Sequence, residues 1–158
     1  MNLNLGAGND FRYSKDWVNL DITKPCNVMA DIRQGIPFKS ASLDMVWASH
    51  ILEHLPDLRA MQRELARIIK YKGVLNVIVP YYLSSDAWGD PTHCRAFSEE
   101  SFFECFWAGF TAVSVTMKQY IKQGTGNKIH WLHVILVRNA VELWEVMRDI
   151  GGNTFNKT

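Results

Sequence analysis

Two glycines and two aspartates near the start of the chain have the types and spacing of a nucleoside site. Gly6 and Gly8 follow a short apolar run, and two later apolar runs end at Asp21 and Asp31. Strand ends that share one edge of an α/β sheet bring a glycine turn and acids to the same ligand. A glycine lets a ligand approach the backbone closely, and a carboxylate accepts both hydroxyls of a ribose. The pattern therefore indicates an adenosine-type ligand.

The same four residues also have purely structural interpretations. Gly-x-Gly alone is a tight turn after a strand, and Asp21 suits an Asx turn. Asp31 suits a helix cap or a solvated acid equally well. A dinucleotide fingerprint is disfavoured, because it requires a third glycine where this chain has Phe11.

A second group with chemical potential is the H-x-x-E-H segment formed by His50, Glu53 and His54. Taken alone, this spacing is that of an inverted zinc-protease motif. Two histidines four residues apart share a helix face and can hold one metal ion. Pro56, however, leaves barely one turn of helix, and no third ligand is evident in the sequence. We therefore expect no metal site, and a zinc hydrolase is the weakest functional alternative.

His93 is the third candidate, in the segment Asp90-Pro91-Thr92-His93. It belongs to a long aromatic-rich connection, residues 81–97, and connections of this length are often functional. Imidazole titrates near neutral pH. His93 is thus a candidate base or substrate hydrogen-bond partner, with local packing as the alternative.

Alternating apolar patterns predict a mostly parallel sheet that ends in an antiparallel hairpin. The run 43–48 is mostly apolar, which is typical of a strand buried on both faces. A turn at 124–127 connects the last two strands. The predicted strands are 3–5, 17–21, 28–31, 43–48, 74–79, 112–115 with an extension toward 121, and 129–137.

Three helices are expected between and after these strands. The first begins at the cap Asp57 and ends at Lys72-Gly73, where glycine adopts a left-handed conformation. The second opens at Ser98, and the third covers 141–150. The connection 9–17 is too short and too polar for a full crossover helix. The predicted buried stripe of the first helix is Leu58, Met61, Leu65, Ile68 and Ile69, and the second helix carries Phe102, Phe103, Phe106 and Phe110.

Length and composition predict one domain over residues 1–158. The chain has 47% apolar residues and a net charge of +1, so the broad basic surface of a nucleic-acid binder is absent. No apolar run approaches the roughly 20 residues that span a bilayer, and no signal peptide is visible. Three cysteines without CxxC spacing favour a reducing cytoplasm.

The order of the motifs resembles the class I S-adenosylmethionine-dependent methyltransferases, especially the methyltransferase type 11 group. The resemblance covers roughly residues 3–138. It rests on the segments Leu3–Asn9, Val18–Asp21, Ala30–Ile32, Ser42–Val46, Ser49–Asp57, Tyr71–Val74 and Asp90–His93.

This resemblance implies an α/β fold: a Rossmann-like, doubly wound seven-stranded sheet of order 3-2-1-4-5-7-6 with strand 7 antiparallel. The version here is minimal, with shortened amino-terminal helices. The implied cofactor is S-adenosylmethionine, lying across the carboxyl ends of strands 1 to 4. In that family Gly6 and Gly8 would flank the methionine part of the cofactor, and Asp21 would bind the ribose hydroxyls. Asp31 and Ile32 would hold the adenine, and Ser49 and His50 would line the sulfonium side. The implied cofactor-binding residues are Leu5, Gly6, Ala7, Gly8, Asn9, Asp21, Ile22, Asp31, Ile32, Ser49 and His50.

The leading functional hypothesis is methyl transfer to an oxygen or nitrogen atom of a small-molecule acceptor, with His50 and His93 as candidate bases. The alternative is a non-catalytic S-adenosylmethionine-binding or interaction subunit on the same fold. It is motivated by two departures from the family, the lack of helices before the first strand and the short first crossover. The side of the cofactor pocket that these helices would otherwise close would be covered by residues 81–97, by a second copy of the chain or by a partner subunit.

Overall fold

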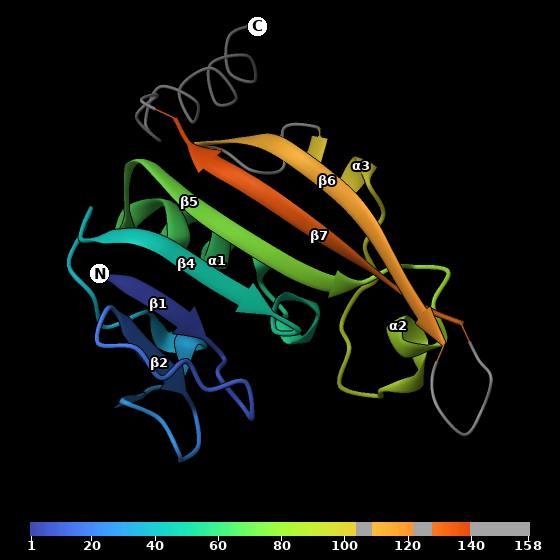
Figure 1. Cartoon of the computed structure of the whole chain (residues 1–158), viewed down its shortest axis with the longest axis horizontal. Helices are drawn as coiled ribbons and strands as arrows, with labels where there is room; N and C mark the ends of the chain where they lie inside the picture. Colours follow the sequence, from blue (N-terminus) through green and yellow to red (C-terminus); the bar gives the residue numbers. More distant parts are fainter. Residues whose placement is uncertain (104–108, 122–127, 140–158) are drawn as a thin grey trace, which may run out of the picture.

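The computed structural model describes residues 1–103, 109–121 and 128–139, and these form one sheet of seven strands (Figure 1). The strand order is β3-β2-β1-β4-β5-β7-β6. All paired neighbours are parallel except β7, which is antiparallel to both β5 and β6. The predicted fold class and sheet order are confirmed. The strands are β1 Asn2–Leu5, β2 Trp17–Asp21, β3 Val28–Met29, β4 Leu43–Ser49, β5 Ile69–Pro80, β6 Phe110–Ile121 and β7 Lys128–Arg138.

Several predicted elements differ in extent from those observed. The strand predicted at 28–31 has two residues, because Ala30 and Asp31 turn toward a short 3-10 helix, η1 (Ile32–Gln34). The connection 81–97 contains a helix, α2 (Ser85–Gly89), that is not among the predicted elements. The helix predicted from Ser98 is α3 (Glu100–Phe103) within the described residues. The turn at 124–127, Phe106 and the helix at 141–150 lie outside them.

The first three strands are connected without crossover helices, which confirms the prediction for the connection 9–17. Residues 6–16 and 22–27, all of them described, contain no helix. Two buried amides hold these connections instead. The Asn4 side chain donates to Asp10 O at 2.6 Å and to Asn19 Oδ1 at 2.9 Å. Asn19 in turn donates to Arg12 O and to Asn27 Oδ1.

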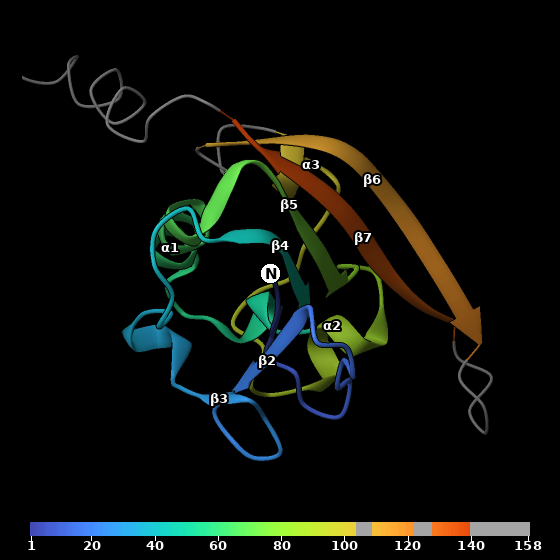
Figure 2. The ribbon, with the colours of Figure 1, turned by 60° about the vertical axis from the view of Figure 1, so that its left-hand side comes forward.

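The two faces of the sheet differ, and the prediction that 43–48 is buried on both faces is wrong. In β4, Leu43, Val46 and Ala48 are fully buried, whereas Asp44 is exposed and Trp47 is half-buried. Helix α1 (Leu58–Ile68) lies against the apolar face (Figure 2) and buries part of its stripe there. On the other face, the Arg12 guanidinium lies over the indoles of Trp17 and Trp47. The alternation therefore reflects one packed face and one more open face.

Helix α1 begins where predicted and ends earlier. The Asp57 carboxylate accepts a hydrogen bond from Ala60 N at 2.9 Å, so the predicted cap is confirmed. The predicted end at Lys72-Gly73 is wrong, because the helix stops at Ile68 and the next residue, Ile69, already pairs with Leu43 in the sheet. None of the helices in the described residues has the length and apolarity needed to cross a membrane.

Gly73 has a packing role in β5. A Cβ at this position would lie 2.6 Å from Ile69 Cγ2, 2.8 Å from Lys70 O and 3.0 Å from Asp44 O. Two of these atoms belong to the backbone and cannot rotate away. We predict that Gly73→Ala lowers the free energy of unfolding by about 1–3 kcal/mol, measured by urea denaturation.

Gly89→Ala is the matched control, because no heavy atom lies within 4 Å of the Cβ it would add. It should leave the free energy of unfolding near that of the wild type. Equal stability of the two variants would contradict the packing role of Gly73.

Candidate functional site

A cavity of about 240 Å³ lies at the carboxyl ends of β1, β2 and β3. Asp21 and Asp31 both line it, together with Gly6, so the glycine turn and the two acids meet at one place. Its lining residues are Gly6, Leu20, Asp21, Ile22, Ala30, Asp31, Ile32, Arg33, Ile51, His54 and Leu55. Such a mixture of apolar walls and a few convergent polar groups is typical of small-molecule sites.

Asp21, the last residue of β2, is fixed by three donors. Its Oδ2 accepts from Gly8 N at 2.9 Å, and its Oδ1 accepts from Thr23 N at 2.9 Å and Thr23 Oγ1 at 3.0 Å. Partial burial alone would raise the pKa of Asp21, but these hydrogen bonds outweigh it and hold the pKa below its ordinary value. Asp21 therefore lines the cavity as a carboxylate whose orientation is set before any ligand binds.

Asp31 caps the 3-10 helix η1 and pairs with Arg33. Its carboxylate accepts from the Arg33 backbone N–H at 3.0 Å, and the Arg33 guanidinium contacts it through Nε and Nη2. The side-chain hydrogen bond from Arg33 is the main reason that the pKa of Asp31 lies below its ordinary value. The Asp31 side chain therefore both caps η1 and lines the first cavity.

Gly6 and Gly8 both have positive φ, +66° and +46°. A Cβ on Gly6 would lie 2.8 Å from Ile51 Cδ1 and 2.9 Å from Ile51 Cγ1, whereas nothing lies within 4 Å of one on Gly8. Gly6 is therefore constrained both by its backbone conformation and by Ile51, which lines the same cavity. Gly8 is constrained by its conformation alone.

A second, wider cavity of about 720 Å³ adjoins the first. Its lining comes from the segment after β4, from the end of β5 and from the connection that contains α2. His54 lines both cavities, so they share a wall. The lining residues are His50, Glu53, His54, Pro80, Ser85, Asp86, Gly89, Asp90, Pro91 and His93.

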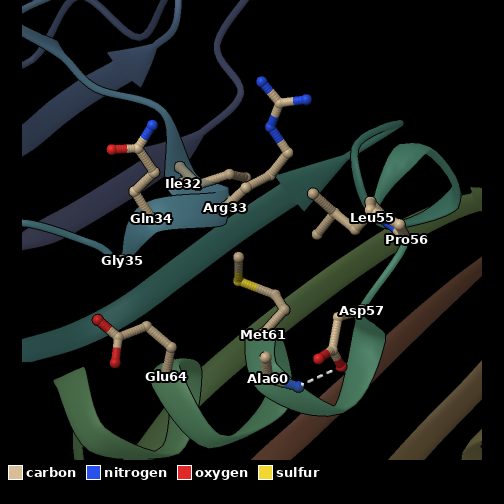
Figure 3. Close-up of a pocket in the computed structure, with 10 residues that line it drawn as sticks. All are labelled: Ile32, Arg33, Gln34, Gly35, Leu55, Pro56, Asp57, Ala60, Met61 and Glu64. Atoms are coloured by element: carbon tan, nitrogen blue, oxygen red, sulfur yellow. Dashed lines mark hydrogen bonds between the residues drawn. The ribbon is translucent and has the colours of Figure 1, made fainter.

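A third cavity of about 370 Å³ separates η1 from α1 (Figure 3). It shares Ile32, Arg33 and Leu55 with the first cavity. In Figure 3 the Met61 side chain projects from α1 into this space, and the Arg33 guanidinium points away from the helix. The first cavity therefore continues outward along an apolar surface.

The predicted site residues fall into three groups. Gly6, Asp21, Ile22, Asp31 and Ile32 line the first cavity. His50 and His93 line the second. The others line none of the three cavities: Leu5 and Ala7 are buried, Gly8 contacts Asp21, Asn9 is exposed and Ser49 ends β4.

Sequence patterns did not indicate several lining residues. Ile51 lies inside the H-x-x-E-H segment and Leu55 directly follows it, and their apolar character gives no sign of a site. Arg33 could have been found as the residue two positions after a predicted adenine-binding acid. His54 was identified only as a metal ligand, and here it separates the two cavities.

The H-x-x-E-H segment does not form the helix that a shared metal-binding face requires. Leu52–His54 is a single 3-10 turn, η2, and His50 precedes it with φ +52°. Glu53 is 1% exposed, and His50 Nδ1 lies 3.3 Å from its Oε1. The interpretation of His50 and His54 as neighbours on one helix face is therefore wrong.

Comparison with known proteins supports the same fold, and one family model matches part of the chain. Residues 11–77 match the family model described as "Methyltransferase domain". No curated protein matches the chain. Similar solved structures are S-adenosylmethionine-dependent methyltransferases from Archaeoglobus fulgidus (17% identity, TM-score 0.64, 87% of this chain and 85% of that chain) and Methanosarcina mazei (16%, 0.63, 87% and 92%).

A third similar structure is a complex between the Haloferax volcanii Trm112 methyltransferase activator and a protein described as a methyltransferase. The identity is 18%, the TM-score is 0.66, and the match covers 87% of this chain and 82% of that chain. At these identities the structural matches establish the fold.

The contact between Gly6 and Ile51 is testable by stability alone. Gly6→Ala should lower the free energy of unfolding by about 1–2 kcal/mol from its positive φ, and by more from displacement of Ile51. In a double-mutant cycle, Ile51→Ala removes the two closest atoms, so the double variant should be more stable than the sum of the single effects. Strict additivity in chemical denaturation would contradict the contact.

Proposed function

We propose that the chain is an S-adenosylmethionine-dependent methyltransferase, since residues 11–77 match the methyltransferase domain, and that it methylates an oxygen or nitrogen atom of a small-molecule acceptor. The observation that carries the proposal is the convergence of Asp21 and Asp31 with Gly6 on one cavity. The wider cavity beyond His54 is the proposed acceptor site. We propose cofactor and acceptor on opposite sides of this histidine.

The residues present fit the cofactor. Asp21 is an oriented carboxylate suited to accept the ribose hydroxyls. Asp31 and Ile32 offer an acceptor and an apolar surface at the position proposed for adenine. Gly6 and Gly8, both at positive φ, add no side chain of their own to the turn beside Asp21. When bound, S-adenosylmethionine supplies an electrophilic methyl group on its sulfonium.

The protein's contribution to the reaction is alignment and proton removal. Alignment of two reactants replaces an encounter in solution with an effectively intramolecular step. An acceptor hydroxyl or ammonium must lose its proton, which requires a base within hydrogen-bond reach. Of the two candidates, His50 has the more accessible side chain, 53% exposed, with the Glu53 carboxylate 3.3 Å away. His93 is 9% exposed, and its Nδ1 is bonded to Ala87 O.

A partner or a second copy remains part of the proposal. The similar Haloferax volcanii complex includes a protein called a methyltransferase activator. Ile22 and Met29, at the β3 edge, are 56% and 63% exposed. Burial of these side chains would favour association at the edge beside the cofactor cavity. If this chain is instead the non-catalytic subunit, it should bind the cofactor without turnover, alone and with its partner.

Cofactor binding tests the first half of the proposal. We predict that S-adenosylhomocysteine binds in titration calorimetry and that Asp21→Asn weakens it roughly 10–100-fold, because hydrogen bonds to a charged group are lost. Asp16→Asn is the control, since Asp16 lines none of the three cavities. Absence of binding by both S-adenosylmethionine and S-adenosylhomocysteine at millimolar concentration would reject the assignment of the cavity.

Turnover tests the second half. S-adenosylhomocysteine release can be followed across a panel of hydroxyl and amine acceptors without knowing the natural one. His50→Gln should lower the rate by about 100-fold or more with the best acceptor. The same variant should leave the dissociation constant of S-adenosylhomocysteine nearly unchanged. A rate unchanged by His50→Gln would remove His50 as the base.

A further inference from the structure

Three metal-binding side chains meet in the wall of the second cavity. Glu53, His54 and His93 each offer a ligand atom, and these atoms all lie within 4.8 Å of one another. The two imidazole rings are in edge contact, with centroids 4.6 Å apart. The connection that carries His93 is held over η2 by a hydrogen bond from Cys94 N to Glu53 O at 2.7 Å. The backbone therefore fixes His93 beside Glu53, although the two are far apart in sequence.

His93 uses one ring nitrogen, Nδ1, in a hydrogen bond, and its other nitrogen, Nε2, lies 3.9 Å from Asp90 Oδ2. His93 Nδ1 lies 3.2 Å from the carbonyl oxygen of Ala87, which can only accept, so Nδ1 carries the hydrogen. In the neutral ring Nε2 then presents a lone pair. A backbone carbonyl in this position is a usual partner of a metal-binding histidine.

His54 is oriented in the same way through a relay. The Thr92 hydroxyl donates to Asp90 Oδ1 at 2.6 Å, so its oxygen accepts from His54 Nδ1 at 2.9 Å. Nε2 of His54 is left with its lone pair. Such a hydrogen bond fixes the tautomer and the orientation of the ring.

Glu53 supplies the negative charge. Its side chain is 1% exposed, and among the described residues no group donates a hydrogen bond to either carboxylate oxygen. The nearest partner, His50 Nδ1, is 3.3 Å from Oε1, within ion-pair distance. Burial of a carboxylate without hydrogen-bonding partners is strongly unfavourable. One ligand atom of each of the three side chains thus lies within 4.8 Å of the others, and a cation between them would give the Glu53 carboxylate a partner.

We propose that Glu53, His54 and His93 bind one divalent transition-metal ion, with Zn²⁺ as the reference ion. Two imidazoles and one carboxylate form a borderline-soft donor set suited to such ions. Ligands of tetrahedral zinc lie about 3.3 Å apart, so small side-chain rotations close the set. Three protein ligands leave a coordination position open, and the adjoining cavity gives it access to an oxygen atom of an acceptor. This last role rests on the proposed function; the binding of the ion does not.

Titration of the full chain with Zn²⁺ and Co²⁺, without a histidine tag and after dialysis against a chelator, tests the site. One equivalent should bind, and the cobalt form should gain visible absorption bands. Glu53→Gln and His93→Gln should each weaken binding roughly 10–100-fold or more. His133→Gln is the matched control, because His133 bonds to Asn76 on the sheet, and Cys94→Ser excludes the nearby thiol as the ligand.

The outcomes separate the metal from the alternatives. Folding of each variant is checked by circular dichroism, and the wild-type melting temperature should rise on addition of Zn²⁺. Absence of binding, or binding weakened equally by His133→Gln or lost with Cys94→Ser, overturns the proposal and leaves His50 as the partner of Glu53. Calorimetry of the metal-free protein with S-adenosylhomocysteine tests the proposed function separately.

Discussion

The buried pairing of Asn4 and Asn19 is the interaction on which the loops beside the first cavity depend. In a doubly wound sheet, helices usually cover the faces of neighbouring parallel strands and fix their connections. Here the connections after β1 and β2 contain no helix. The backbone of Asp10 and Arg12 in the first, and the Asn27 side chain in the second, bond to these two amides. Both side chains are nearly inaccessible, 2% and 1% exposed. An unpaired buried amide costs about 1–3 kcal/mol, so the amides and the loops stabilise one another.

This arrangement explains how a small sheet presents an ordered site. The loop held by Asn4 carries the glycine turn, and the turn in turn donates to Asp21. The wall between the two cavities comes from a different source, the 3-10 turn after β4. Long-range hydrogen bonds from Arg95 to Leu55 O and Pro56 O hold the connection 81–97 against the segment that follows this turn. Two separate sets of polar contacts therefore position the two halves of the site.

Local signals in the sequence predicted most of the sheet, and tertiary packing decided the rest. The Asp57 cap and the apolar runs of β4 and β5 depend on neighbours in the chain, so they were predictable. The end of α1 was not predictable. The sequence Lys72-Gly73 is typical of a helix end, but Gly73 lies in β5, where close packing requires a glycine. The order of the strands came from a family resemblance. Likewise, His93 could not be paired with Glu53 from spacing, since only the folded connection brings them together.

The direct passage from α1 into β5 has a consequence for how the length of this chain can vary. One inserted residue at the Ile68–Ile69 junction would turn the helix by about 100° or reverse the faces of the strand. Either change would move an apolar stripe into water. Pairing between β4 and β5 jumps from Leu43–Ile69 to Met45–Val74, and Tyr71 and Lys72 are exposed at this irregularity. Insertions and deletions between homologues should therefore collect at the irregularity or in the helix-free connections, and should spare the junction.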